Sequence, residues 1–340
     1  MMTVKPTNQT ISMRPAAMQD LHGVVDLLNT CQLEQVGEAH LEEGLIRAEW
    51  ESPGRDLAKD TRVALSSDGS VVGYIEIWDQ EPHVRLHVYG RVHPDYRGQN
   101  IGSALAGWAE TRARQAIPKS PPGARVSMGQ EAHSADTATR ALLEGEDYRE
   151  MRASYQMKIE MDTPPPSLLL PPGIGIRPYV TGQEDEAVLL TERDSFRDHW
   201  GYVERPLEKD RERFLHWIAA DPRYDPSLWF VAVERDQIIG VSLCQLKTAK
   251  IPDIGSVDSL AVLRPWRRRG IGLALLLHSF GEFYRRGTNR VELGVDAQNL
   301  TGATRLYEKA GMQVKNNFVY YEKELRPGLD LSTQSSIDSE

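Results

Sequence analysis

Cysteine is almost absent from this chain of 340 residues, which contains only Cys31 and Cys244. Two isolated cysteines provide neither a disulfide framework nor the Cys-x-x-Cys spacing of a structural zinc site, so we expect no bound metal. Cys244 lies in an apolar, strand-like run, and the sequence offers no paired base for a thiol nucleophile. We therefore interpret Cys244 as a small core residue.

Long apolar runs and an excess of basic residues are missing as well. No segment approaches the length that crosses a membrane, and the first ten residues are polar, so we expect a soluble, cytoplasmic protein without a membrane partner. The 40 Lys and Arg residues are outnumbered by 49 Asp and Glu residues, which gives a net charge of −9. An acidic chain without a long basic block binds nucleic acid poorly, so we expect no nucleic-acid partner.

Proline is concentrated in one place, with five prolines between Asp162 and Gly175. These prolines fit neither a helix nor a central strand, so residues 161–173 are predicted to form a stiff linker. The two sides of this linker begin alike, with Ile-Ser-Met-Arg-Pro at 11–15 and Ile-Gly-Ile-Arg-Pro at 174–178. Both continue with a helical pattern, two strands around a turn, a further strand, an Arg/Gly-containing turn and a helix. We predict an internal duplication of one domain, with copies at 11–160 and 174–326 and a flexible polar tail at 327–340.

The order of elements predicts an α/β fold, with one mixed twisted sheet per domain and helices on both faces. A final hairpin is predicted to extend to Glu324. The other elements expected in the second copy are strands 174–179, 228–234, 238–246, 255–263 and 290–295, and helices 184–195, 207–220, 271–286 and 301–310.

The most informative segment lies between a predicted strand and a predicted helix, and reads Arg-Arg-Arg-Gly-Ile-Gly-Leu-Ala at 267–274. Glycines at such a junction let backbone N–H groups point outward at the positive end of the helix dipole, which suits a pyrophosphate. The spacing matches neither a P-loop nor the G-x-G-x-x-G of dinucleotide-binding folds. A plain basic turn at a helix start is the alternative interpretation.

A second pattern follows about thirty residues later, from Asn299 through Ala303 and Tyr307 to Gly311. Asn299 could cap the helix, and Gly311 suits its C′ position, where a positive φ is easiest for glycine. The two patterns together resemble the acyl-CoA signatures of the GNAT (Gcn5-related N-acetyltransferase) superfamily, in which Arg267, Gly270 and Gly272 fill the fixed positions. An ordinary core tyrosine is the alternative interpretation of Tyr307.

The resemblance implies two tandem GNAT-like domains and acetyl-CoA as the co-substrate. In this family the pantetheine arm inserts between two splayed strands, where the Leu260 and Val262 backbone would contact it, and the tyrosine lies beside the thioester sulfur as a candidate acid. The remaining acyl-CoA contacts implied are Arg267, Arg268, Arg269, Gly270, Ile271, Gly272, Leu273, Ala274, Asn299 and Ala303.

The reaction implied is transfer of an acetyl group to a primary amine of a small molecule. With no covalent nucleophile evident, we expect direct attack in a ternary complex, with the Val262 N–H stabilising the developing oxyanion. Many relatives carry a glutamate on this strand, but the position here is Ser256. We choose Asp258, two residues further on the same predicted face, as the general base. Asp253 and Glu292 are weaker options, and a backbone-satisfied polar residue is the alternative interpretation of Asp258.

Substrate contacts are expected from the loop after the first helix of the second copy, at Asp198, His199 and Trp200. The alternative is that Phe196 and Trp200 are core aromatics and that His199 caps a helix, although His199 could also serve as the base. The tandem architecture is similar to that of the mycothiol synthase group, but these features do not identify the acceptor.

The first copy lacks several of these residues. Asn100 stands where the second copy has Gly270, and Leu143, Ala135 and Asp147 align with the tyrosine, asparagine and glycine of the second pattern. We therefore interpret the first domain as degenerate and inactive. A non-catalytic acyl-CoA-binding or sensor protein is the alternative function, and formation of a homodimer stays open.

Overall fold

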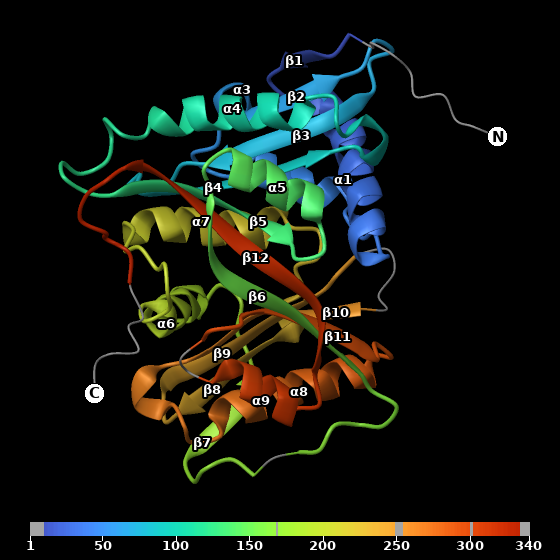
Figure 1. Cartoon of the computed structure of the whole chain (residues 1–340). Coiled ribbons are helices and arrows are strands. Elements are labelled where there is room, and N and C mark those ends of the chain that lie inside the picture. Colours follow the sequence, from blue (N-terminus) through green and yellow to red (C-terminus); the bar gives the residue numbers. More distant parts are fainter. Residues whose placement is uncertain (1–9, 168, 249–253, 300–301, 334–340) are drawn as a thin grey trace. The chain divides into compact units, whose positions relative to one another are not determined.

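The computed structural model describes residues 10–167, 169–248, 254–299 and 302–333. The chain forms two compact units (Figure 1). Unit 1 contains Met1–Met151 and Tyr320–Asp330, and unit 2 contains Arg152–Val319 and Leu331–Glu340. The units therefore differ from the two sequence copies, because each unit contains a piece of chain from the far side of the proline-rich segment.

Unit 1 is a mixed sheet covered on both faces by helices. Its strands follow the order β1-β2-β3-β4-β5, and only the β4–β5 pair is parallel. The elements are β1 (Ser12–Arg14), α1 (Leu21–Val36), α2 (Glu43–Trp50), α3 (Leu57–Asp60), β2 (Thr61–Leu65), β3 (Val71–Trp78), β4 (Arg85–Val92), α4 (Ile101–Arg114), β5 (Val126–His133) and α5 (Thr137–Gly145).

Unit 2 repeats this plan with the strand order β6-β11-β10-β9-β8-β7, in which only the β10–β11 pair is parallel. The predicted α/β class is confirmed, and α6 and α8 cover opposite faces of this sheet (Figure 1). The elements are β6 (Arg149–Glu160), β7 (Ile174–Pro178), α6 (Asp185–Phe196), α7 (Leu207–Ala220), β8 (Trp229–Glu234), β9 (Gln237–Leu246), β10 (Ile254–Val262), α8 (Ile271–Arg285), β11 (Arg290–Asp296), α9 (Ala303–Lys309) and β12 (Gln313–Arg326).

The hairpin predicted before Glu324 is wrong, because β12 is one continuous strand. Its residues up to Val319 belong to unit 2, and those from Tyr320 belong to unit 1. Asn316 lies inside this strand, where it donates a hydrogen bond of 2.6 Å to Gln156 on β6. Strand β12 thus contributes residues to both units.

Strand β6 makes the reverse exchange. It precedes the proline-rich segment, yet it pairs with β11 over seven positions, from Ser154↔Asp296 to Glu160↔Arg290. This pairing makes the end of the first sequence copy a structural part of unit 2.

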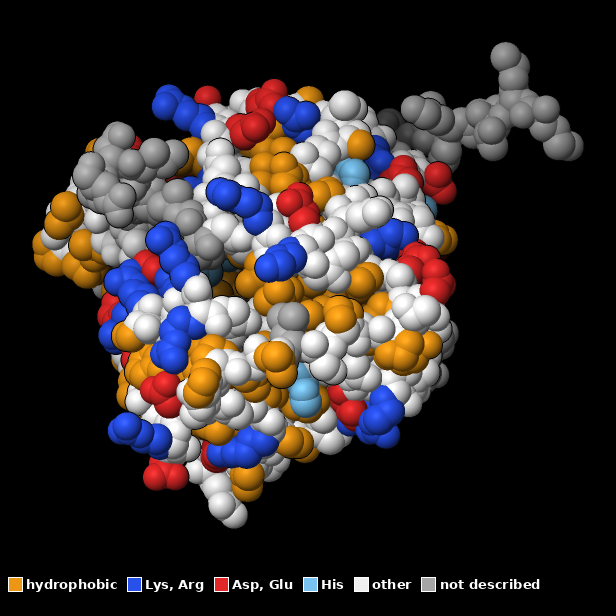
Figure 2. Space-filling view, turned by 90° about the horizontal axis from the view of Figure 1, so that it is seen from below, with side chains coloured by type: hydrophobic (Ala, Val, Ile, Leu, Met, Phe, Trp, Pro, Cys, Tyr) orange, Lys and Arg blue, Asp and Glu red, His pale blue; other side chains and the backbone are white. Residues whose placement is uncertain are grey.

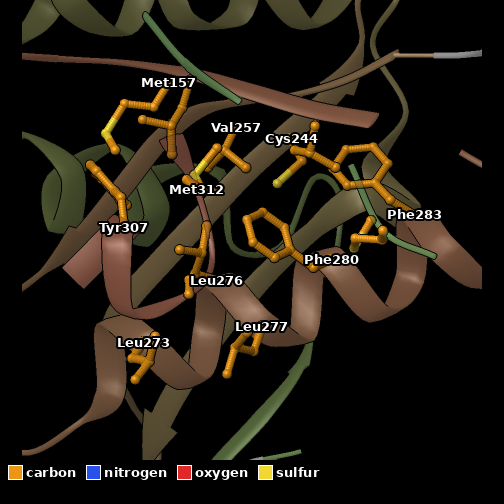
Figure 3. Close-up of a cluster of buried hydrophobic side chains, with 14 of the residues drawn as sticks. Met157, Cys244, Val257, Leu273, Leu276, Leu277, Phe280, Phe283, Tyr307 and Met312 are labelled. Atoms are coloured by element: carbon orange, nitrogen blue, oxygen red, sulfur yellow. The ribbon is translucent and has the colours of Figure 1, made fainter. Parts of the chain in front are cut away.

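The core of unit 2 lies between α8 and the sheet (Figure 3). The helix predicted at 271–286 is observed as α8, and its Leu276, Phe280 and Phe283 are completely buried. Cys244 is a core residue of the same cluster, and burial raises the pKa of its thiol to about 12.

The chain after Arg326 was predicted to be a flexible tail. Its described part, up to Thr333, makes backbone hydrogen bonds, with Leu329 donating to Gly123 in unit 1 and Thr333 donating to Tyr202 in unit 2 (both 2.8 Å). On the face that Figure 2 shows, Lys and Arg side chains form separate groups with acidic and apolar side chains between them. Within the described ranges, no helix is both long and apolar enough to cross a membrane.

Candidate active site

The central feature of unit 2 is a parting of β10 and β11. Their pairing ends at Ser256↔Glu292, although β10 continues along β9 to Val262 and β11 continues along β6 to Asp296. The two facing edges are left open and line a cleft of about 520 Å³.

The open edge of β10 presents backbone groups to this cleft. The Leu263 N–H donates to the Ile239 carbonyl on β9 at 2.9 Å. Because successive N–H groups in a strand point to opposite edges, the N–H and C=O groups of Val262 and Leu260 face the cleft. An amide-containing ligand could therefore lie along this edge as an additional strand.

The turn before α8 forms the other end of the cleft. Arg268 and Gly270 both adopt left-handed backbone conformations, with φ of 61° and 81°. A Cβ atom at Gly270 would meet no protein atom within 4 Å, so the positive φ and not crowding favours glycine here. Successive N–H groups in such a turn, at the start of a 15-residue helix, form an anion-binding concavity.

Arg267 and Asp198, expected to contact pyrophosphate and substrate, instead bind each other. The Arg267 guanidinium donates to the Val262 carbonyl (3.0 Å), the Ser195 carbonyl (2.6 Å) and the Asp198 carboxylate. Arg264 also donates to Asp198 at 3.0 Å. Burial acts to raise the pKa of Asp198, but the hydrogen bond from Arg267 and the positive charges of Arg267 and Arg264 together outweigh burial, and the pKa is lowered. Both side chains therefore join the end of β10 to the loop after α6.

Among the three arginines of the turn before α8, Arg268 is the one whose side chain has no acidic partner among the described residues. It lines the cleft, and it forms no ion pair with any residue that the structure describes. Arg269 points elsewhere, 3.5 Å from Glu234, and Ala274 is buried inside α8. Neither lines the cleft. The other expected acyl-CoA residues that line it are Leu260, Val262, Gly270, Ile271, Gly272, Leu273, Asn299 and Ala303.

Tyr307 lies on α9 and reaches the cleft from the side of β11. Its ring packs beside Met157 and Met312 (Figure 3), and only 8% of the residue is exposed. Burial raises its pKa to about 12, so the phenol is protonated at neutral pH. Tyr307 lines the cleft, and its hydroxyl has no hydrogen-bond partner among the described residues. The prediction that Asn299 caps α9 is wrong, because the N-cap residue is Gly302 in a left-handed conformation.

Asp258 is the extra residue of a β-bulge. Val257 pairs with Cys244 and Ser259 pairs with Leu243, the next residue of β9, which leaves Asp258 without a partner on that strand. Bulges re-aim side chains, and this one brings Asp258 to the wall of the cleft. Ser256 donates a hydrogen bond to its carboxylate, as expected for two side chains on one face. The Asp258 side chain is exposed to solvent in the cleft, but the protein atoms that crowd around its carboxyl group disfavour the charged form and raise its pKa.

Glu292, a weaker option for the base, is already neutralised. It is 2% exposed and accepts hydrogen bonds from Lys247, Lys315 (2.7 Å) and Gln156 (2.8 Å). Burial acts to raise its pKa, but the two lysines outweigh burial and lower it. Such a carboxylate is a poor proton acceptor. Asp253, the other option, lies outside the described residues.

The loop after α6 contributes His199 to the cleft but not Trp200. Burial lowers the pKa of His199, whose ring meets the ring of Phe196 edge-on at 4.6 Å. The Arg152 guanidinium lies over the Trp200 ring, 5.0 Å from the centre of that ring, and Arg152 also pairs with Asp296 at 2.8 Å. Trp200 thus holds the loop in place from outside the cleft.

Unit 1 keeps the same turn and the same parting of strands. Gly98 and Asn100 have φ of 75° and 62°, and the β4–β5 pairing ends at His87↔Gly129. Its cleft is smaller, about 240 Å³. The alignment of Leu143 with Tyr307 agrees with the backbone: the residue five positions later, Tyr148 or Met312, donates to that carbonyl at 3.0 Å in both units.

The two central strands differ in length by one residue. Strand β4 has eight residues and pairs with β3 without a register shift, whereas β10 has nine and contains the bulge. Matching the ends of the two strands aligns Val92 with Val262 and Arg85 with Ile254, so Asp258 has no counterpart in unit 1.

Comparison with known proteins places this geometry in a family. The model of the acetyltransferase (GNAT) family matches residues 21–120 and 190–312, one segment in each sequence copy. A mycothiol acetyltransferase from Salinispora arenicola is 30% identical over 268 residues, covering 76% of this chain and 80% of that protein.

Solved structures of acetyltransferases also resemble this chain. A GCN5-related N-acetyltransferase from Sphaerobacter thermophilus is 35% identical, with a TM-score of 0.77 over 95% of this chain and 98% of that one. A tandem GNAT protein from the clavulanic acid biosynthesis pathway shares the fold at 17% identity, with a TM-score of 0.71 over 94% of this chain and all of that one (100%). The chain therefore belongs to the GNAT family. It is a tandem N-acetyltransferase, similar to mycothiol acetyltransferases, of a family that uses acyl-CoA.

Sequence reasoning missed Glu192, a carboxylate on α6 whose pKa is raised, chiefly by burial. Glu192 lies at helical spacing from Val188 and Ser195, and a charged residue in such a stripe was the available signal.

Proposed function

We propose that unit 2 transfers the acetyl group of acetyl-CoA to a primary amine of a small molecule, by direct attack in a ternary complex. One observation carries the proposal: the open edge of β10 and the left-handed turn before α8 border one cleft, with Asp258 and Tyr307 on its walls. The names of the mycothiol acetyltransferase relatives support a small-molecule acceptor.

The residues of this cleft suit acetyl-CoA, which supplies the thioester and the thiol leaving group. The Leu260 backbone and the Val262 carbonyl can pair with the pantetheine amides, which leaves the Val262 N–H for the thioester carbonyl. The N-terminus of α8, together with the unpaired Arg268 guanidinium, can hold the pyrophosphate. Arg267 contributes by fixing the end of β10 and not by contacting phosphate.

Asp258 is proposed as the general base. An alkyl ammonium group has a pKa near ~10, so it must lose a proton before its nitrogen can attack. The raised pKa of Asp258 suits this transfer, because a more basic carboxylate is a better proton acceptor. The Val262 N–H is placed to stabilise negative charge on the carbonyl oxygen.

Tyr307 is proposed as the general acid. As the new N–C bond forms and the C–S bond breaks, the thiolate sulfur takes the phenolic proton. The second proton lost by the nitrogen restores the phenol through solvent. With one proton accepted by Asp258, the balance is one acetamide, one thiol and one proton released.

The substitution Tyr307→Phe tests this assignment. We expect kcat to fall about 100-fold while acetyl-CoA affinity, measured by calorimetry, stays within twofold. The matched control is Tyr148→Phe, which removes the hydroxyl of a buried tyrosine five residues after Leu143, the unit 1 counterpart of Tyr307, and should leave kcat unchanged. Unchanged turnover in Tyr307→Phe would remove the acid role.

A non-catalytic acyl-CoA-binding or sensor protein is the second candidate. Ser256, at the position where many relatives carry glutamate, is the observation that favours it. Tight acetyl-CoA binding without an acetylated product, across a panel of amino sugars, amino acids, polyamines and peptides, would support this candidate over the first.

A further inference from the structure

The loop that follows α6 lines the cleft with Phe196, Asp198 and His199. Apolar burial does little to hold it there, because every residue from 196 to 202 keeps part of its surface exposed. A loop with few buried apolar contacts opens at a low cost in free energy unless polar contacts fix it. The polar contacts of this loop therefore decide whether His199 stays in the cleft.

Two of these contacts attach the loop to the two strands that border the cleft. Asp198 accepts hydrogen bonds from Arg267, which also donates to the carbonyl of the last β10 residue. Trp200 packs against Arg152, which pairs with the last residue of β11. The loop thus runs from one open edge of the cleft to the other, and His199 lies between the two attachments.

A third contact reaches the loop from a residue that follows β12. Thr333 and the loop exchange two backbone hydrogen bonds, because the Thr333 N–H donates to the Tyr202 carbonyl (2.8 Å) and the Gly201 N–H donates to the Thr333 carbonyl (2.9 Å). The Thr333 hydroxyl donates to the Arg197 carbonyl at 2.9 Å. Gly201, Tyr202 and Thr333 are not among the residues that line the cleft, so this contact holds the loop from its other side.

Each of the three bonds serves a backbone group that secondary structure leaves open. Arg197 is the C-cap residue of α6, and carbonyls at the end of a helix have no donor within that helix. Gly201 and Tyr202 lie between α6 and α7, where no strand ladder pairs their backbone. Thr333 therefore acts for this loop as a neighbouring strand would, with one side-chain bond in addition.

We propose that Thr333 is a positioning residue of the acceptor site, which holds the loop 197–202 in place so that His199 forms a fixed wall for the amine substrate. This inference rests on the proposed function. Thr333 acts through the loop and contacts neither substrate. The segment that follows β12, predicted from its composition to be a flexible tail, is in this proposal a functional part of the acetyltransferase site.

Release of the loop should affect the two substrates differently. An amine that needs the loop in place binds only the fraction of molecules in which it is in place, so KM rises by the inverse of that fraction. At saturating amine the same complex forms, so kcat stays unchanged. The proposed acetyl-CoA contacts lie on β10, α8 and α9, and the pair between Asp198 and Arg267 persists, so acetyl-CoA affinity stays unchanged as well.

The test compares two shortened chains with the full chain. The amine is the one that the full chain acetylates fastest in a panel of amino sugars, amino acids, polyamines and peptides. A chain that ends at Asp330 loses all three hydrogen bonds, and its KM for this amine should rise about tenfold, as expected for a loop that is in place about one-tenth of the time. Its kcat, and its acetyl-CoA affinity by calorimetry, should stay within about twofold.

The matched control is a chain that ends at Ser335, which keeps Thr333 and should match the full chain in all three quantities. An unchanged KM in the chain that ends at Asp330 would overturn the inference. A rise in KM of equal size in both shortened chains would also overturn it, because the effect would then not depend on Thr333.

Point substitutions test the hydroxyl in a chain of full length, and they remain informative if the shorter chain fails to fold. Thr333→Val keeps the shape and both backbone bonds but loses the bond to Arg197, so KM for the amine should rise about two- to threefold. Thr333→Ser keeps the hydroxyl and should retain the KM of the full chain. Equal KM values in Thr333→Val and Thr333→Ser would contradict the role of the hydroxyl.

A further readout does not depend on turnover. The Gly201 N–H should exchange with deuterium about tenfold faster in the chain that ends at Asp330, whereas the amides of α8 should exchange at the rates of the full chain. Equal exchange at Gly201 would overturn the inference. Faster exchange at Gly201, in a protein whose full chain acetylates no amine of the panel, would instead overturn the proposed function and leave the attachment of the loop in place.

Discussion

Neighbouring side chains of one motif have different tasks. The acyl-CoA signature identified the turn at Arg267–Gly270, but a motif fixes backbone positions and not the direction of each side chain. Arg267 joins β10 to the loop after α6, whereas Arg268, held at φ 61°, lines the cleft without an ion pair among the described residues. The partner of Arg267, Asp198, is distant in sequence and could not be predicted from the motif.

These different contacts predict opposite phenotypes for two adjacent arginines. Arg268→Ala should weaken acetyl-CoA binding about tenfold, by loss of a charge-assisted contact, and leave the free energy of unfolding unchanged. Arg267→Ala should lower that free energy by about 2–3 kcal/mol, because two carbonyls and a half-buried carboxylate lose a donor. Calorimetric binding and urea unfolding separate the two, and equal effects on binding would contradict this division.

At the scale of helices and strands, periodicity was sufficient for most of unit 2. The predicted helix 207–220 has the observed bounds of α7, and the predicted strand 255–263 lies one residue from the observed β10. The bulge at Asp258 could not be predicted, because one extra residue leaves no mark in composition. It was also the feature that decided which side of the sheet Ser259 faces.

Strand β11 depends on one buried carboxylate. Glu292 accepts hydrogen bonds from Lys247, which directly follows β9, from Lys315 on β12 and from Gln156 on β6. Glu292→Gln leaves two lysines without their counter-charge, and we expect unfolding to become easier by about 2–4 kcal/mol at pH 7.

The same carboxylate should make the free energy of unfolding depend on pH in a definite direction. Since the folded state lowers the pKa of Glu292, its contribution is fully present above the unfolded value of about 4.3 and is lost as pH falls through the folded value. The difference in urea midpoint between wild type and Glu292→Gln should therefore persist from pH 7 to about pH 5 and shrink below about pH 4. A difference that grows on acidification would refute this assignment.

The two structural units of the molecule do not coincide with the two copies in its sequence. The proline-rich segment lies between the two segments that the family model matches, but residues 152–160 belong to unit 2 and Tyr320–Asp330 to unit 1. Exchange of strands depends on contacts between residues far apart in the chain, which composition and local periodicity do not record.

This exchange predicts how the chain behaves when it is cut. Fragments 1–166 and 167–340, expressed separately, each lack a strand that completes a sheet and should be insoluble or unfolded by circular dichroism. Expressed together, they should co-purify as a folded pair. A chain that starts at 174 and folds with full activity would show that β6 is dispensable.

A matched pair of variants tests which of the two units carries out the reaction. Gly270→Glu and Asn100→Glu place a carboxylate at equivalent left-handed positions of the two units, so backbone strain is similar in both. Gly270→Glu should abolish acetyltransferase activity, whereas Asn100→Glu should stay within twofold of wild type in a thiol-release assay. Loss of activity in Asn100→Glu alone would move the reaction to unit 1.

The one-residue difference between β4 and β10 has a consequence for how the two copies could evolve. Point substitutions can restore a glycine at 100 or a tyrosine at 143, and selection can test such steps one at a time. They cannot restore a bulge, which requires a whole codon to be inserted in frame within a paired central strand. Once the two gene copies differ in length at this strand, point substitutions alone cannot remove the difference. The first copy therefore stays free to acquire another use.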